Sequence, residues 1–134
     1  MNNIEGISRT DKIYLYTFPG ICGIYTVSDA ECAVYLNDRG ETKLFLAVKE
    51  KIDDSKLSAN GGKYDGEYSS FKIFGTGMRG SSNILCRTMK IMEDNDIKYR
   101  VSSMCESGLV FIMDRESAIK MFECAKEEFK ISLS

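Results

Sequence analysis

The sequence contains no histidine and no tryptophan, and its 134 residues include a single proline, Pro19. Histidine is the usual general base near neutral pH and the commonest zinc ligand in proteins. Its absence leaves Asp, Glu, Lys, Tyr and Cys as the candidates for any catalysis. We expect no catalytic residue, no metal site and no cofactor.

Long apolar runs and an excess of charge are also missing. No apolar run approaches the roughly 20 residues that a membrane span requires, and no signal peptide is evident. The formal net charge is -2, and Glu50 interrupts the longest basic cluster, Lys49 to Lys51. Nucleic acid and membranes are therefore poor candidates as partners. The five cysteines lack Cys-x-x-Cys spacing, so we expect a cytoplasmic protein with reduced thiols.

The chain is long enough for one domain, or for two very small ones that share a core. Its second half has the clearest pattern, because apolar residues recur there at three- and four-residue spacing in two segments. These segments predict two amphipathic helices in a βαββα order. The expected elements are a strand around Phe71, a helix around Ile84–Met92, strands at 97–105 and 109–113, a helix at 116–129 capped by Asp114, and a closing strand at 130–133.

The first half has a weaker pattern. Pro19-Gly20 should end its first strand, because proline removes a backbone donor from the sheet. Residues 58–70 carry several glycines and no apolar periodicity, which predicts a boundary between a half at 1–65 and a half at 66–134. The expected elements are strands at 12–18, 32–37 and 42–48 and a helix at 49–57; a helix at 28–36, capped by Ser28, competes with the second strand.

Two short motifs suggest chemistry. Gly75 to Gly80 satisfies Gly-x-Gly-x-x-Gly between a strand and a helix, as a dinucleotide site requires. The next strand ends in Ser103-Met104-Cys105 and lacks the acidic partner, so a tight turn is favoured, or a helix N-terminus that binds a small carboxylate. Ser117 to Lys120 matches Ser-x-x-Lys, but no Ser-Asp-Asn partner follows. Neither motif predicts an enzyme.

Several segments resemble the regulatory region of aspartokinases. Lys72-Ile73-Phe74-Gly75-Thr76-Gly77-Met78-Arg79 is similar to the Lys-Val-x-x-Val-Gly-x-Gly-Met-Lys pattern that opens the last ACT domain of that region. Ser103-Met104-Cys105-Glu106 stands where the family has Ser-Thr-Ser-Glu, and Ala118 to Phe129 resembles its closing helix. Ile4 to Lys12 is similar to the lead-in to the first ACT domain, with Pro19-Gly20 at the family's Asp-Lys-Pro-Gly.

The resemblance implies an α+β fold, a two-layer ferredoxin-like (ACT) sandwich of βαββαβ order, with a shortened N-terminal half. Two departures concern the effector site. Gly80 to Ile84 replaces the family's Ser-His-Pro-Gly-Val loop, and Thr17 replaces an aspartate that commonly contacts the effector's ammonium. The sequence contains no segment like a kinase domain, so the resemblance implies a regulatory module and not an enzyme.

By this resemblance, the module would bind a small amino acid of the lysine or threonine class at the strand-to-helix loops. An alternative is a ligand-free interaction or dimerisation module, forming a homodimer through sheet edges or helices, or contacting a partner enzyme. The expected ligand-binding residues are Met78, Arg79, Gly80, Ser81, Ser82, Asn83 and Ile84, with Thr17, Pro19 and Gly20 from the first half, and Ser103 and Glu106, beside Tyr99, on the far side.

Overall fold

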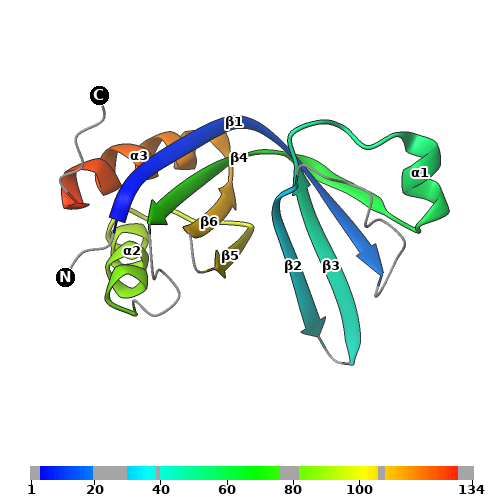
Figure 1. The fold of residues 1–134 in the computed structure, drawn as a ribbon, viewed down its shortest axis with the longest axis horizontal. Helices are drawn as coiled ribbons and strands as arrows, with labels where there is room; N and C mark the ends of the chain where they lie inside the picture. The colour runs from blue at the N-terminus through cyan, green and yellow to red at the C-terminus, as the bar shows by residue number, and fades with distance from the viewer. Residues whose placement is uncertain (1–3, 20–29, 39, 76–81, 106–107, 130–134) are drawn as a thin grey trace.

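The computed structural model describes residues 4–19, 30–38, 40–75, 82–105 and 108–129. Figure 1 shows α2 and α3 at one end of the molecule and α1 at the other, with β1 and β4 running between the two ends. In chain order, the elements are β1 (Ile4–Pro19), β2 (Ala30–Asp38), β3 (Glu41–Val48), α1 (Asp54–Ala59), β4 (Lys63–Gly75), α2 (Ser82–Asp94), β5 (Val101–Cys105), β6 (Gly108–Met113) and α3 (Arg115–Phe129).

The described strands form one antiparallel sheet of order β2-β3-β1-β4-β6-β5. Its two long central strands, β1 and β4, each run through both halves of this sheet. Residues 4–10 of β1 pair with residues 70–75 of β4, next to β6. Residues 13–17 of β1 pair with residues 63–68 of β4, next to β3. Both halves of the sheet therefore depend on the same two strands.

The long strand β1 bends where its pairing with β4 is interrupted. The register shifts between Thr10 and Ile13, which is the pattern of a bulge, and a bulge bends a strand. Ser69 lies opposite this bulge, fully buried, and its hydroxyl donates a hydrogen bond of 2.7 Å to the carbonyl oxygen of Asp11. This bond satisfies a backbone acceptor that the sheet leaves unpaired, so the bend is a built feature.

The helices α2 and α3 cover one face of the β1, β4 and β6 end of the sheet. Successive side chains of a strand point to opposite faces, so Leu109, Phe111 and Met113 of β6 face the helices. Burial of these side chains against the apolar stripes of the two helices is the main stabilising term here. The helix residues fully or nearly fully buried in this cluster are Ile84, Ile91, Met92, Ala118, Met121, Ala125 and Phe129.

The opposite face of β6 is buried as well. Val110 and Ile112 pack in a second cluster with residues of β1 and β3, among them Leu15, Phe45 and Ala47. The edge strand β2 contacts the other edge strand, β5, so the sheet curls until its two inner surfaces face each other. Figure 1 shows β2 and β5 approaching in the middle of the molecule.

The outer face of the first half is covered by α1 and the segment before it. Tyr16, Phe18, Leu44, Leu46 and Val48 form a third cluster, against which Ile52 and Leu57 pack. Strand β3 thus contributes side chains to both of its faces, which explains why residues 44–48 are buried without interruption.

Much of the expected architecture is confirmed. The structure is α+β, with helices on an antiparallel sheet, and residues 30–38 form a strand and not the competing helix. Asp114 caps the last helix, because its Oδ1 accepts a hydrogen bond of 2.8 Å from the backbone N–H of Ser117. The candidate closing strand at 130–133 lies outside the described residues; β1 occupies the position beside residues 70–75 of β4.

Four expected boundaries are wrong. Strand β1 begins at Ile4 instead of residue 12, and β4 begins at Lys63, inside the segment expected to hold the boundary between the two halves. Both errors have one kind of cause, since each polar segment becomes a strand by pairing with a distant one: residues 4–10 pair with residues 70–75, and residues 63–68 pair with residues 13–17. The helix expected at 49–57 is α1, Asp54–Ala59, and β5 begins at Val101 and not at residue 97. The division at residue 65/66 stays a prediction, and its boundary falls within β4.

We expect the two halves to unfold together, because β1 and β4 belong to both. Met121→Ala in the helix-covered cluster and Leu46→Ala in the third cluster should each cost about 2–5 kcal/mol of the free energy of unfolding. Each should shift one common transition in urea, followed by circular dichroism. Glu127→Ala, at an exposed position on α3, is the control. Two separate transitions, each moved by only one substitution, would contradict shared stability.

Candidate functional site

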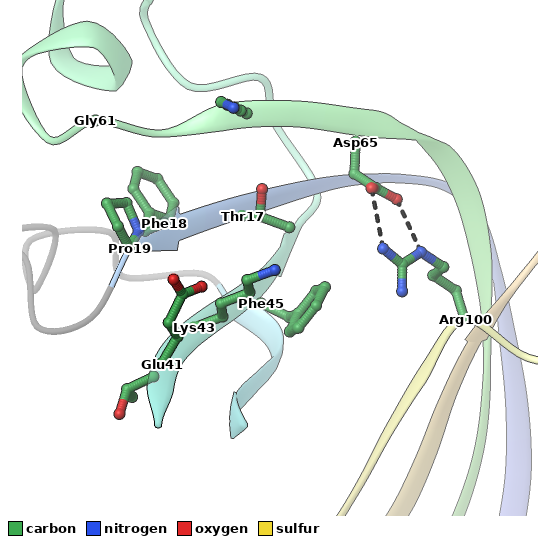
Figure 2. Close-up of a pocket in the computed structure, with 11 residues that line it drawn as sticks. Thr17, Phe18, Pro19, Glu41, Lys43, Phe45, Gly61, Asp65 and Arg100 are labelled. Carbon is green, nitrogen blue, oxygen red and sulfur yellow. Dashed lines mark hydrogen bonds and ion pairs between the residues drawn. The ribbon is translucent and has the colours of Figure 1, made fainter. Parts of the chain in front are cut away.

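An open hollow of about 730 Å³ lies at the end of β1, where the two halves of the sheet face each other. Figure 2 shows Glu41 and Lys43 on β3 and Thr17 on β1 along its walls, with the paired side chains of Asp65 and Arg100 at one end. The hollow is lined by Thr17, Phe18, Pro19, Glu41, Thr42, Lys43, Phe45, Gly61, Lys63, Asp65 and Arg100.

The register of three neighbouring strands brings these side chains together. Thr17 of β1 pairs with Phe45 of β3 on one side and with Lys63 of β4 on the other. Pro19 pairs with Lys43 in the same way. Residues directly opposite each other project to the same face of a sheet, so the two rows form one continuous wall.

A bulge in β4 directs Asp65 to this face. The pairing shifts from Tyr16 opposite Tyr64 to Leu15 opposite Gly66, which leaves Asp65 as the extra residue. Asp65 and Tyr68 are three residues apart and would point to opposite faces of a regular strand. Because of the bulge they meet, and the Tyr68 hydroxyl donates a hydrogen bond of 2.8 Å to Asp65 Oδ2.

Arg100 joins the two halves of the molecule at this hollow. Its Nε and Nη2 donate hydrogen bonds, each of 3.2 Å, to the two carboxylate oxygens of Asp65, and its guanidinium lies 5.1 Å from the ring centre of Phe45. The hydrogen bond to Asp65 is the main cause that raises the pKa of Arg100. A bidentate, stacked arginine holds a fixed geometry that a lysine would not reproduce.

Arg100 itself is held in place by the second half. Its backbone N–H donates a hydrogen bond of 2.7 Å to the carbonyl oxygen of Ile112, one residue before β5 begins. The side chain retains 41% exposure and that of Asp65 retains 21%, so solvent screens the pair and its net contribution to stability is small. Its structural effect is to fix one end of the hollow.

Three charged side chains along the hollow are left for a ligand. Glu41, Lys43 and Lys63 are exposed, and within the described part of the chain none of them makes an ion pair. Asp65 and Arg100 neutralise each other. The hollow therefore offers two ammonium groups, one carboxylate and the hydroxyls of Thr17 and Thr42 to a small polar molecule.

The expected site residues separate into distinct places. Thr17 and Pro19 line the hollow. Asn83 is exposed and Ile84 buried at the start of α2, while Ser103 is half-buried on β5 and does not line the hollow. Ser82 begins α2. The other expected residues, Met78, Arg79, Gly80, Ser81, Gly20 and Glu106, lie outside the described residues, so their role stays a prediction.

Tyr99 lies at a different hollow, of about 690 Å³, near the end of α2. Met89, Met92 and Ile97 form its apolar part, and Glu93, Asp96 and Lys98 its polar part. The Tyr99 ring packs edge-on against Phe111, with 5.1 Å between ring centres. The lining residues of this hollow come from α2 and the segment after it, and none of them lines the first hollow.

Sequence reasoning did not identify Lys43, Lys63, Asp65 and Arg100 as candidates. The alternation of Glu41, Lys43 and Phe45 along one strand was a usable signal, since these residues share a face. Nothing local links them to Lys63 or Arg100, which reach the hollow only through the pairing of distant strands. No cluster of three or more metal-ligating side chains occurs in the described part of the chain, and no helix there could cross a membrane.

The fold defined by these elements is shared with solved structures of aspartate kinase regulatory subunits. The chain resembles the regulatory subunit of aspartate kinase from Thermus flavus with a TM-score of 0.74 at 11% identity, covering 96% of this chain and 99% of that one. The ligand-free regulatory subunit from Thermus thermophilus gives a TM-score of 0.72 at 10% identity, with coverage of 96% and 99%.

A complete aspartate kinase shows the same likeness. The enzyme from Synechocystis gives a TM-score of 0.72 at 13% identity, and the match covers 98% of this chain but 28% of that one. No family model and no curated protein matches the sequence. The resemblance seen in the sequence is thus confirmed at the level of the fold.

We expect Tyr68 to make the free energy of unfolding fall at alkaline pH. Burial and the hydrogen bond to Asp65 raise the pKa of Tyr68 above its ordinary value of 10.0. A raised pKa gives stability that is fully present below the unfolded value, about 10, and is lost as the pH rises through the folded value. Urea unfolding between pH 8 and 11 should therefore show a smaller loss of stability in Tyr68→Phe than in the wild type.

Tyr64→Phe is the matched control, because Tyr64 is exposed and its hydroxyl donates nothing to Asp65. This control should retain the wild-type fall in stability at high pH. An equal fall in Tyr68→Phe would show that deprotonation of Tyr68 does not contribute to the loss of stability at high pH.

Proposed function

We propose that this chain is a regulatory module of the ACT type that binds a small amino acid in the hollow at the end of β1. The observation that carries the proposal is the presence of unpaired charges of both signs, Glu41 against Lys43 and Lys63, around one concave surface. A free amino acid carries an ammonium and a carboxylate, so it can engage both. The names of the similar structures, regulatory subunits of aspartate kinase, support a regulatory role.

We further propose that each half is one ACT unit of βαββαβ order, the first being shortened. In the first unit, residues 13–19 of β1, then β2, β3, α1 and residues 63–68 of β4 supply the described elements. In the second, residues 70–75 of β4 are followed by α2, β5, β6 and α3, and residues 4–10 of β1 take the place of the last strand. The second unit thus takes its last strand from the segment that precedes the first unit in the chain, which supports a signal passing between them.

The hollow lies where such a signal would originate. Asp65 and Phe45 belong to the first unit, whereas Arg100 comes from the segment between α2 and β5 of the second. A ligand held beside this contact touches both units at once. A ligand that favours one arrangement of the two units over another would shift their equilibrium.

Calorimetric titration with the twenty amino acids should detect binding of at least one of them. Thr17→Phe places a bulky ring on the wall of the hollow and should weaken this binding at least about 10-fold, a loss of about 1.4 kcal/mol. Tyr99→Ser alters the other hollow and should leave the affinity unchanged. Silence for every amino acid at millimolar concentration would refute the proposal; loss of binding in Tyr99→Ser alone would move the site to the second hollow.

The second candidate function is a ligand-free interaction module. Strand β2 pairs only with β3 among the described strands and exposes Leu36, at 47%. An edge strand with an exposed apolar side chain is a surface for pairing with another chain. The function would then be assembly with a second copy or with a partner enzyme.

This candidate predicts a dimer in light scattering at micromolar concentration. Leu36→Lys places a charge on the edge and should raise the dimer dissociation constant at least about 10-fold, because charged edge residues oppose strand pairing. Ile119→Lys, on the exposed side of α3, is the control. A monomer at all concentrations would contradict self-association through β2.

A further inference from the structure

From the charges along the hollow we infer that its ligand is an acidic amino acid, with two carboxylates and one ammonium, and not a basic or neutral one. The inference rests on the proposed function and specifies its ligand. It departs from the lysine or threonine class that the sequence resemblance implies. The structure places Glu41, Lys43 and Lys63 on the same concave surface.

The described lining of the hollow carries one positive charge that no lining residue compensates. Five lining residues are charged: three cations and two anions. Asp65 and Arg100 form a bidentate pair, so neither is available without breaking two hydrogen bonds. The remaining groups, Lys43, Lys63 and Glu41, carry a net charge of one positive unit. A ligand with one net negative charge compensates it.

The two lysines of the hollow lie on either side of β1. Lys43 is on β3 and Lys63 on β4, with β1 between them. The strand spacing and a register offset of two residues separate their Cα atoms by about 12 Å. Both lysine stems are long enough to reach inward over the strand between them, where Thr17 lies. A ligand above Thr17 therefore has an ammonium group on either side, which suits two carboxylates.

Glu41 is the group in the hollow that can bind the ammonium of the ligand. Glu41 and Lys43 are two residues apart on β3 and project to the same face, as Figure 2 shows. Glu41 can thus accept the ligand ammonium while Lys43 binds the adjacent carboxylate. A dicarboxylate without an amino group would leave Glu41 without a partner and place three negative groups together, which is unfavourable.

The same charges disfavour the alternatives. A lysine ligand would bring a net positive charge into a hollow that is already positive, and like charges in contact weaken binding. Threonine would leave one of the two lysines unpaired. Selectivity then comes from repulsion of the wrong ligand as well as attraction of the right one.

Calorimetric titration of the full chain with L-aspartate, L-glutamate, their amides L-asparagine and L-glutamine, succinate, L-threonine and L-lysine tests the inference. Aspartate or glutamate should bind at least about 10-fold more tightly than its amide, because the amide loses one charge-assisted hydrogen bond. The acidic ligand should also bind more tightly than succinate. Its affinity should fall as the salt concentration rises.

Three charge-removing substitutions assign the contacts. Lys43→Gln and Lys63→Gln should each weaken binding of the acidic amino acid by about 10- to 100-fold, and Glu41→Gln should remove its advantage over succinate. Lys90→Gln is the control. Lys90 lies on α2 and does not line the hollow, so this substitution should leave the affinity unchanged. All four positions are exposed, so thermal unfolding should confirm that the variants fold.

The outcomes separate this inference from the proposed function. If threonine or lysine binds more tightly than aspartate and glutamate, and Thr17→Phe removes that binding, the hollow is an amino-acid site but not one for acidic ligands. Equal binding of acid and amide would overturn the inference in the same way. No binding of any of these compounds at millimolar concentration would overturn both the inference and the proposed function.

Discussion

The structure depends on the pairing of two long strands, β1 and β4, along almost their entire length. Each backbone N–H and C=O group buried in a sheet needs a partner, and these two strands satisfy each other's groups in both halves of the molecule. The helix-covered cluster, the second cluster and the third cluster all include side chains from β1. Displacing this one strand would therefore open every layer of the core.

Local departures from regular pairing turn this framework into a site. The bulge at Asp65 brings its carboxylate to the Tyr68 hydroxyl on the inner surface, and the bend near Asp11 lets the two halves of the sheet face each other. Arg100 then spans the remaining distance from the second half. Surface ion pairs contribute little stability, but a bidentate contact of this kind fixes where a hollow begins and which charges remain free within it. The site is a product of register and not of any single motif.

The sequence could predict those parts of the fold that have a strong local pattern. The buried run at 109–113, the apolar stripe of α3 and the Asp114 cap needed no distant partner, and the β-rich composition of residues 42–48 was enough to predict that strand. Residues 4–10 and 63–68 lack such a pattern, because each is a strand only when paired with a distant segment, residues 70–75 and residues 13–17 respectively. Thr17 and Pro19 could be proposed as site residues, because they fall in a segment that resembles the family. Lys63, Asp65 and Arg100 could not be identified from the sequence. Their proximity depends on pairing between distant segments and on one inserted residue.

The pairing of residues 4–10 with the second half has a consequence for how the chain folds as it is synthesised. Residues 4–10 leave the ribosome long before residues 70–75, the segment of β4 with which they pair. During that interval the early segment has no strand to pair with on this side, and contacts between distant segments form slowly. An unpaired strand edge is the kind of surface that associates with other chains. Residues 8–12 are polar, which is why the sequence does not predict a strand there. The same polarity disfavours association with other chains before β4 is available for pairing.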